Sequence, residues 1–284
     1  MISRYFVYFI IYSFLGWIYE TCYCTIKEKA WNNRGFLYGP CIPLYGTGAT
    51  LAQIIFVERP FGESLSTNNI NIFLVCAIGS FILEYSTSYF LEKRFHARWW
   101  DYSKMPLNIK GRVCLIFTAC FGIAGVVIVN YLIPPIMNSM NHIPGFVMEI
   151  FALIFMFIFG MDMALTVSAL TSFAKDFERI TDEFNENMAA RVANIYEELS
   201  DYKLASIEKA NERKEEMQSK KELTAEKLAE IREQLSSEAV KNWIAKATET
   251  QRGQFRHIAK FTHPVENTKS LLEKGSSYLR NHKK

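Results

Sequence analysis

The sequence lacks the motifs that mark the common soluble enzymes. It has no glycine-rich phosphate loop ending in Gly-Lys-Ser/Thr, so the chain does not hydrolyse ATP by that route on its own. It also lacks a Gly-x-Ser-x-Gly elbow, a His-Glu-x-x-His zinc motif and any Cys/His cluster with metal-ligand spacing. We therefore expect no ATPase, hydrolase or metal-dependent activity, no cofactor and no nucleic-acid partner.

Charge is scarce in the first part of the chain. Residues 1–174 hold 11 of the 32 Lys and Arg residues and 9 of the 29 Asp and Glu residues. The remaining residues, 175–284, are more than one third charged. A mean hydropathy near zero hides this division, which indicates two regions in two different solvents.

Five apolar stretches in the first region are long enough to cross a bilayer, which takes about 20 residues. We expect an all-α bundle of five transmembrane helices at about residues 5–26, 36–57, 70–91, 113–133 and 145–170. Pro134-Pro135 is expected to end the fourth span. The bundle covers residues 1–172, and residues 173–284 form a separate helical tail.

The loops between these spans carry alternating numbers of basic residues. In order, they hold 3, 1, 6 and 0 Lys or Arg residues, and the basic tail follows the fifth span. Basic loops stay on the cytoplasmic side. This pattern predicts a multi-pass cell-membrane protein with its N-terminus outside and its C-terminus in the cytoplasm.

The second span is rich in helix-disrupting residues. Pro40 and Pro43 alternate with glycines that include Gly35 and Gly39. Proline removes a backbone donor, and in lipid the freed groups need partners inside the protein. Two interpretations stay open here: a kinked helix packed closely through its glycines, or a discontinuous helix beside a substrate site.

The first four spans resemble a duplicated hairpin. Placing Gly35 on Gly111 also places Gly46 on Gly122, and each unit has one glutamate inside its preceding span. Both units would run in the same direction through the membrane. This pattern predicts a parallel internal repeat, a type that transporters use.

Four acidic residues lie within the expected spans: Glu20, Glu84, Glu149 and Asp162. A buried carboxylate in lipid is expected to be paired or protonated and to face the bundle interior. Glu149 falls near the outer end of the fifth span. Asp162 lies deeper and has no basic partner nearby in sequence, which makes it the stronger functional candidate.

Two of these acids have basic residues at the same level of the next helix. We expect the pairs Glu20–Arg34 and Glu84–Arg112, either as ion pairs that fix each hairpin or as parts of a proton or cation path. The loop before the fourth span contains Trp99, Trp100 and Asp101 among basic residues. It predicts a short interfacial helix or, alternatively, a docking surface for a cytoplasmic partner.

The tail begins with an amphipathic pattern. Apolar residues recur about every 3.6 positions between Phe173 and Tyr202, which is the period of a straight helix continuing from the fifth span. A second charged helix that folds back on it, or an oligomer contact, would follow. Residues after about 248 are expected to be flexible.

Three motifs in order resemble one family. FLGWIYE (14–20), NRGFLYGPCIPLYGTGA (33–49) and RWWDYSKMPLNIKGRVCL (98–115) are similar to a bacterial family described as putative ABC-transporter permease, type IV. The match spans about residues 5–170. The residues that match the family's motifs are Gly35, Gly39, Pro40, Pro43, Glu20, Trp99, Trp100, Asp101 and Tyr102. The resemblance implies a permease-like subunit of unknown substrate, with its ATPase on another chain, and carries over no catalytic residue.

Two further functions compete with this one. The chain is alternatively a non-transporting scaffold or sensor that recruits cytoplasmic partners, or forms an oligomer, through its tail. An intramembrane enzyme using Glu84 and Asp162 as an acid–base pair is a third option.

Overall fold

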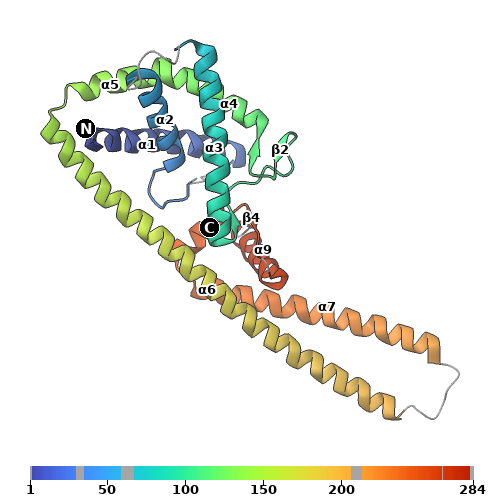
Figure 1. Ribbon diagram of the computed structural model, residues 1–284. Coiled ribbons are helices and arrows are strands. Elements are labelled where there is room, and N and C mark those ends of the chain that lie inside the picture. Colours follow the sequence, from blue (N-terminus) through green and yellow to red (C-terminus); the bar gives the residue numbers. More distant parts are fainter. Residues whose placement is uncertain (1, 30–34, 59–66, 206–212, 264, 282–284) are drawn as a thin grey trace. The chain divides into compact units, whose positions relative to one another are not determined.

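The computed structural model describes residues 2–29, 35–58, 67–205, 213–263 and 265–281 (Figure 1). These residues are mostly helical and divide into two units. Unit 1 contains residues 1–170 and 257–262, and unit 2 contains residues 171–256 and 263–284. Each unit is described on its own below.

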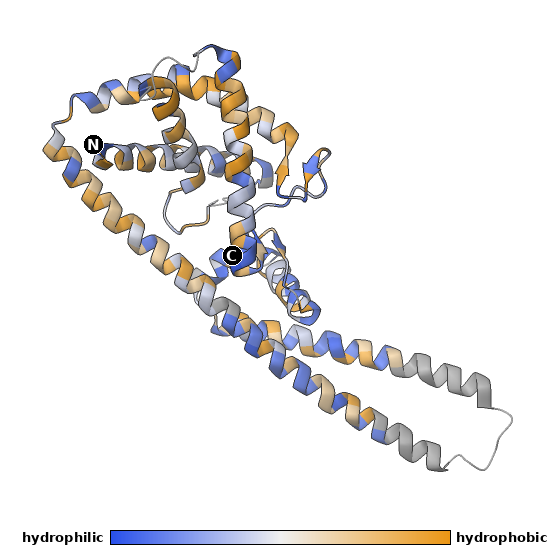
Figure 2. Ribbon diagram, in the orientation of Figure 1, coloured by the Kyte–Doolittle hydropathy of each residue, from blue (hydrophilic) through white to orange (hydrophobic). Residues whose placement is uncertain are grey.

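Four helices that begin in unit 1 are long and apolar enough to cross a membrane. They are α1 (Ile2–Glu28), α3 (Asn69–Phe95), the continuous run Leu115–Asn141, and the first part of α6 (Gly145–Ala205). Apolar residues dominate all four (Figure 2). Large side chains such as Phe157 and Leu165 on α6 are exposed, as expected for helices whose solvent is lipid.

The expected span at 36–57 is not one uninterrupted helix. Its helix, α2 (Pro43–Gln53), begins only at Pro43 and ends in a π-helical turn, η1 (Ile54–Glu58), while residues 35–42 are not helical. Proline disfavours helical geometry at the residue before it, and it tolerates the first helical turn, where no donor is needed. The two prolines therefore delay the helix start and leave a discontinuous element.

Pro134-Pro135 does not end the fourth span, contrary to expectation. Helix α4 (Leu115–Val127) passes through a π-helical turn, η2 (Ile128–Leu132), into α5 (Ile133–Asn141). A π-helical turn widens the backbone just before the prolines, which gives their rings room against the preceding carbonyls. The helix therefore continues past them.

Two antiparallel helix pairs are held together by close contacts at glycine. A Cβ atom on Gly46 of α2 would lie 2.5 Å from the Phe9 carbonyl oxygen of α1 and would also collide with Ser13. A Cβ atom on Gly122 of α4 would lie 2.7 Å from the Phe73 ring and 3.0 Å from its carbonyl oxygen on α3. Close backbone approach at small residues is the usual way to pack helices in lipid.

The two hairpins share this arrangement at matched positions. Gly46 and Gly122 correspond in the sequence alignment, and each lies against a phenylalanine of the preceding helix. Both second helices also end in a π-helical turn. The duplication itself stays a prediction.

One apolar cluster joins the ends of both hairpins. It contains Tyr8 and Tyr12 of α1 together with Phe56 of η1, Ile72 of α3 and Ile133 of α5, all almost fully buried. Helix α6 packs on α1 through Phe159, whose ring contacts those of Phe6 and Phe9 edge-on. These contacts fix the helix that carries Asp162 beside the broken second element.

Unit 2 has its own core. Phe177 from the later part of α6 packs against Trp243 of α7 (Arg213–Lys246) and Phe255 of α8 (Glu249–His257), with ring centroids 5.0–5.6 Å apart. Helix α9 (Glu266–Asn281) adds buried Leu271 and Leu272. The part after residue 248, which was expected to be flexible, contains α8, α9 and a short strand, β4 (Lys260–Phe261), that belongs to unit 1.

The contact at Gly46 yields a test of the packing. We expect Gly46→Ala to destabilise the protein by about 1–3 kcal/mol, because the new methyl group meets backbone as well as side chain. Gly160→Ala is the matched control, since a Cβ atom there meets nothing within 4 Å. Thermal unfolding of both variants in detergent measures the difference. Equal midpoints for the two variants would contradict the close approach of α1 and α2.

Candidate functional site in the bundle

The Asp162 carboxylate binds the backbone of the broken second element. The Tyr38 N–H donates to Oδ1 at 3.0 Å, and the Gly39 N–H donates to Oδ2 at 2.9 Å. Thr166, one turn further along α6, donates to Oδ1 at 3.5 Å. Two backbone donors that no helix satisfies are thus satisfied by one side chain from a distant helix.

The residues of the Gly/Pro motif have separate places in this arrangement. A Cβ atom on Gly39 would lie 2.8 Å from Asp162 Oδ2, so a larger residue would displace the carboxylate. Gly35 has ordinary space, with its nearest neighbour at 3.6 Å. Pro40 is exposed, and Pro43 forms the first turn of α2. Of the four, Gly39 is the one tied to the site by close contact.

The two glutamates of the hairpins each receive a tyrosine hydroxyl. Tyr45 of α2 donates to Glu20 Oε2 at 2.7 Å, and Tyr102 donates to Glu84 Oε1 at 3.4 Å. The expected Glu20–Arg34 pair involves a residue outside the described ranges. Glu84 lies on α3 and is 4% exposed, and its tyrosine comes from the loop after α3.

The expected Glu84–Arg112 pair is wrong. Arg112 instead contacts Glu92, two turns further along α3, with its Nη1 2.8 Å from Glu92 Oε2. Its guanidinium also lies over the rings of Tyr85 and Tyr89. Glu92 lies close to the end of α3, where the arginine keeps its charge at the edge of the apolar region instead of carrying it deeper.

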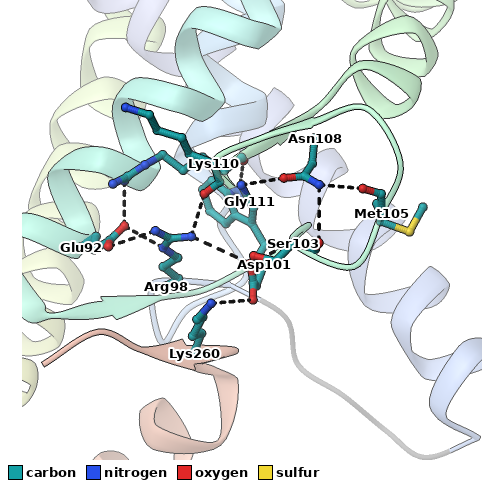
Figure 3. A network of polar contacts seen from close by, with 11 residues as sticks. Glu92, Arg98, Asp101, Ser103, Met105, Asn108, Lys110, Gly111 and Lys260 are labelled. Atoms are coloured by element: carbon teal, nitrogen blue, oxygen red, sulfur yellow. Dashed lines mark hydrogen bonds and ion pairs between the residues drawn. The ribbon is translucent and has the colours of Figure 1, made fainter. Parts of the chain in front are cut away.

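Glu92 is the centre of an ion-pair network at this end of the bundle (Figure 3). Arg98 binds it with two parallel hydrogen bonds, Nε to Oε2 at 2.6 Å and Nη2 to Oε1 at 3.0 Å. Arg98 also donates to the Lys110 carbonyl at 3.0 Å, and its Nη1 lies 3.9 Å from Asp101 Oδ1. A bidentate guanidinium fixes direction as well as distance, so this network orients the loop.

The loop after α3 is a small β structure, and the expected interfacial helix is wrong. Strand β2 (Asn108–Ile109) pairs with β3 (Val113–Cys114), and Gly111 turns between them with a φ of +69°. The Asn108 side chain accepts from the Gly111 N–H at 2.9 Å and donates to the Met105 carbonyl at 2.7 Å. These bonds replace the helical ones that Pro106 disfavours.

The paired tryptophans fix this loop to the bundle. Trp99 is buried, and its ring contacts Phe36 edge-on at 5.2 Å and Phe95 at 6.2 Å. Trp100 donates its indole N–H to the Arg112 carbonyl at 2.9 Å. Both rings therefore have defined contacts in the structure.

A strand from the end of the chain completes this site. Strand β1 (Ala97–Arg98) pairs antiparallel with β4, and the Ala259 N–H donates to the Arg98 carbonyl at 2.7 Å. Lys260 Nζ lies 3.5 Å from Asp101 Oδ2. Burial raises the pKa of the Asp101 carboxyl, but hydrogen bonds from Ser103 and the nearby Lys260 outweigh it and lower the pKa below its usual range.

Sequence reasoning missed three of these residues, Tyr45, Glu92 and Lys260, and it singled out Tyr102 only as a motif match, without its bond to Glu84. Glu92 lies just past the expected third span, and nothing in the sequence indicated that it binds two arginines. Lys260 has no local sequence signal, because its partner is about 160 residues away. Glu149, in contrast, was singled out and is simply exposed on α6.

Apolar helices of membrane length, an interrupted element and buried acids define an integral membrane protein of the helical-bundle class. The chain belongs to the family described as putative ABC-transporter type IV, whose model matches residues 7–167. No significant match to the chain was found among curated proteins or among solved structures. The match covers the hairpins, the loop and Asp162.

The Asp162 contact can be tested by replacing the carboxylate. We expect Asp162→Asn to destabilise the protein by about 1–3 kcal/mol, because the amide nitrogen then faces a backbone N–H that it cannot accept from. Glu149→Gln on the same helix makes the equivalent chemical change at an exposed position. Thermal unfolding in detergent compares them. If Asp162→Asn unfolds no earlier than the control, the carboxylate does not hold the broken element.

The ion-pair network provides a second test. Glu92→Gln removes the charge that Arg98 and Arg112 share, and we expect a loss of about 1–3 kcal/mol. Lys93→Gln changes the charge at the adjacent, exposed position and serves as the control. Urea-induced unfolding monitored by tryptophan fluorescence gives both values, since Trp99 and Trp100 lie in the loop. A loss that is the same for both variants would refute the central place of Glu92.

Proposed function

We propose that this protein is a permease-like subunit of a transporter, in which the broken second element forms a polar joint held by Asp162. The observation that supports it is the pair of hydrogen bonds from Tyr38 and Gly39 to that carboxylate. The family description agrees with a transporter component. The substrate is left open.

The contact is suited to a movable part. Non-helical backbone at membrane depth is tolerated where it is buried in protein or lines a wet cavity. Here a single side chain on α6 satisfies two donors of the segment 35–42, so one interaction decides whether that segment stays closed. A polar group of a substrate, or water, is able to take the place of the carboxylate when the joint opens.

The topology proposal keeps an odd number of crossings. Residues 43–58 form about 24 Å of helix at 1.5 Å per residue, and the non-helical residues 35–42 add further length. This interrupted element is enough for a crossing between α1 and α3. With the basic loops on the cytoplasmic side, the N-terminus lies outside and unit 2 lies in the cytoplasm.

Energy would come from another chain. The sequence has no phosphate-binding loop, so a separate nucleotide-binding subunit is the expected partner. The structured loop between α3 and α4 lies on the cytoplasmic side in this topology and is held rigid by the Glu92 network. A rigid loop on that side is a suitable contact for such a subunit. The duplicated hairpin fits the same proposal, because repeats of this kind are a common plan of transporters.

Purification of the tagged full chain from its own membranes tests this function. We expect a nucleotide-binding subunit to co-purify, and the complex in liposomes to hydrolyse ATP. Asp162→Asn should lower the hydrolysis rate several-fold, because the joint no longer closes, whereas Gly160→Ala should leave it unchanged. A chain that purifies alone, with no ATPase activity in the preparation, would argue against a transporter subunit and favour the scaffold alternative.

A further inference from the structure

The Glu84 carboxylate has an unusual environment. It lies near the middle of α3 with 4% of its surface exposed. Tyr102 donates to Oε1 at the long distance of 3.4 Å, while Oε2 is buried and has no hydrogen-bond partner among the described residues. An ionised carboxylate oxygen left without a donor is strongly disfavoured in such a place.

The ionisable group that interacts electrostatically with Glu84 is a second carboxylate, that of Glu20. The Glu20 carboxylate of α1 is close enough to interact with it electrostatically, and Tyr45 of α2 donates to Glu20 at 2.7 Å. Helix α4, which packs against α3, has no Asp, Glu, Lys, Arg or His residue. Arg112, the basic residue expected here, is bound to Glu92 instead.

Two carboxylates so placed do not both ionise readily. Each negative charge raises the cost of the other, and a low dielectric strengthens the repulsion. Glu20 is only partly buried and has a good donor at 2.7 Å, so it is the better place for the charge. Glu84 is deeper and has one weak donor, so it is the better place for a proton.

We propose that Glu84 and Glu20 form a proton-binding pair inside the bundle, in which Glu84 carries the exchangeable proton and Glu20 carries the charge. Release breaks the O–H bond of the Glu84 carboxyl, passes the proton to water and raises the charge of the pair from −1 to −2. Uptake reverses each of these changes. The role of this proton in moving a substrate rests on the proposed function, but the binding site itself does not.

Each carboxylate of the pair is hydrogen-bonded to the segment that follows its own helix. Tyr45 connects Glu20 to α2, and Tyr102 connects Glu84 to the loop before α4, where its ring stacks on Phe117 with centroids 5.0 Å apart. The second charge would fall on Glu84, so it would strengthen the bond from Tyr102 and add repulsion between α1 and α3. Protonation therefore sets how tightly the two first helices of the hairpins are held.

Infrared difference spectroscopy of the full chain in liposomes tests the site. We expect the carbonyl band of a protonated carboxyl group at neutral pH, and its loss in Glu84→Gln. Glu149→Gln should keep the band, because that carboxyl is exposed and lies outside the proposed pair. Glu20→Gln retains Glu84 but removes the neighbouring charge, so the band should then disappear at a lower pH than in the unaltered protein.

Several outcomes would overturn the proposal. They are the absence of the band at neutral pH, its persistence in Glu84→Gln, and an unchanged titration in Glu20→Gln. Loss of the band on adding sodium at constant pH would also overturn it, in favour of a metal-cation site. The measurement needs no substrate, so it separates the two proposals. A band without ATP-driven activity would support the proton-binding pair and contradict the transporter function. ATP-driven activity without a band would support the transporter function and contradict the proton-binding pair.

Discussion

The need of every backbone donor for a partner in lipid is the constraint on which the bundle depends. Residues 35–42 cannot meet this need with helical hydrogen bonds, because two prolines disfavour a helix there. The consequence is that Asp162, more than 120 residues away, must reach this segment. That requirement fixes the position of α6 on α1, where Phe159 contacts Phe6 and Phe9. One interruption in a helix thus determines the place of another helix.

Close packing at glycines holds the two helices of each hairpin together. Glycines at 46 and 122 bring each second helix onto the backbone of the helix before it, and bulky phenylalanines fill the space beside them. The hydrophobic effect gives no drive for helix association in lipid, so such contacts and polar pairs have to supply it. The tyrosine–glutamate bonds within the bundle and the Glu92 network at its edge are polar contributions of this kind.

Properties that depend on local composition were predictable from the sequence. Apolar runs located four membrane-length helices, and the prolines at 40 and 43 marked the interruption, although not which of two forms it would take. Asp162 was singled out because a lone acid in lipid needs an explanation. Its partners were not predictable, since they are backbone N–H groups that any sequence has. The prolines at 134 and 135 misled because a π-helical turn accommodates them. Arg112 was matched to the wrong glutamate, because both lie on α3 and a two-turn difference is beyond what spacing resolves.

The pairing of β4 with β1 changes what kind of part the charged region is. The chain leaves unit 1 after residue 170, re-enters it at residue 257 and leaves it again after residue 262, so residues 171–256 lie between two segments of unit 1. Residues 171–256 therefore cannot be removed by truncation without also removing residues 257–262 of unit 1. Ending the chain at residue 170 would leave the His96 and Arg98 carbonyls without the N–H donors of Thr262 and Ala259. The chain therefore crosses the boundary between the membrane part and the charged part more than once.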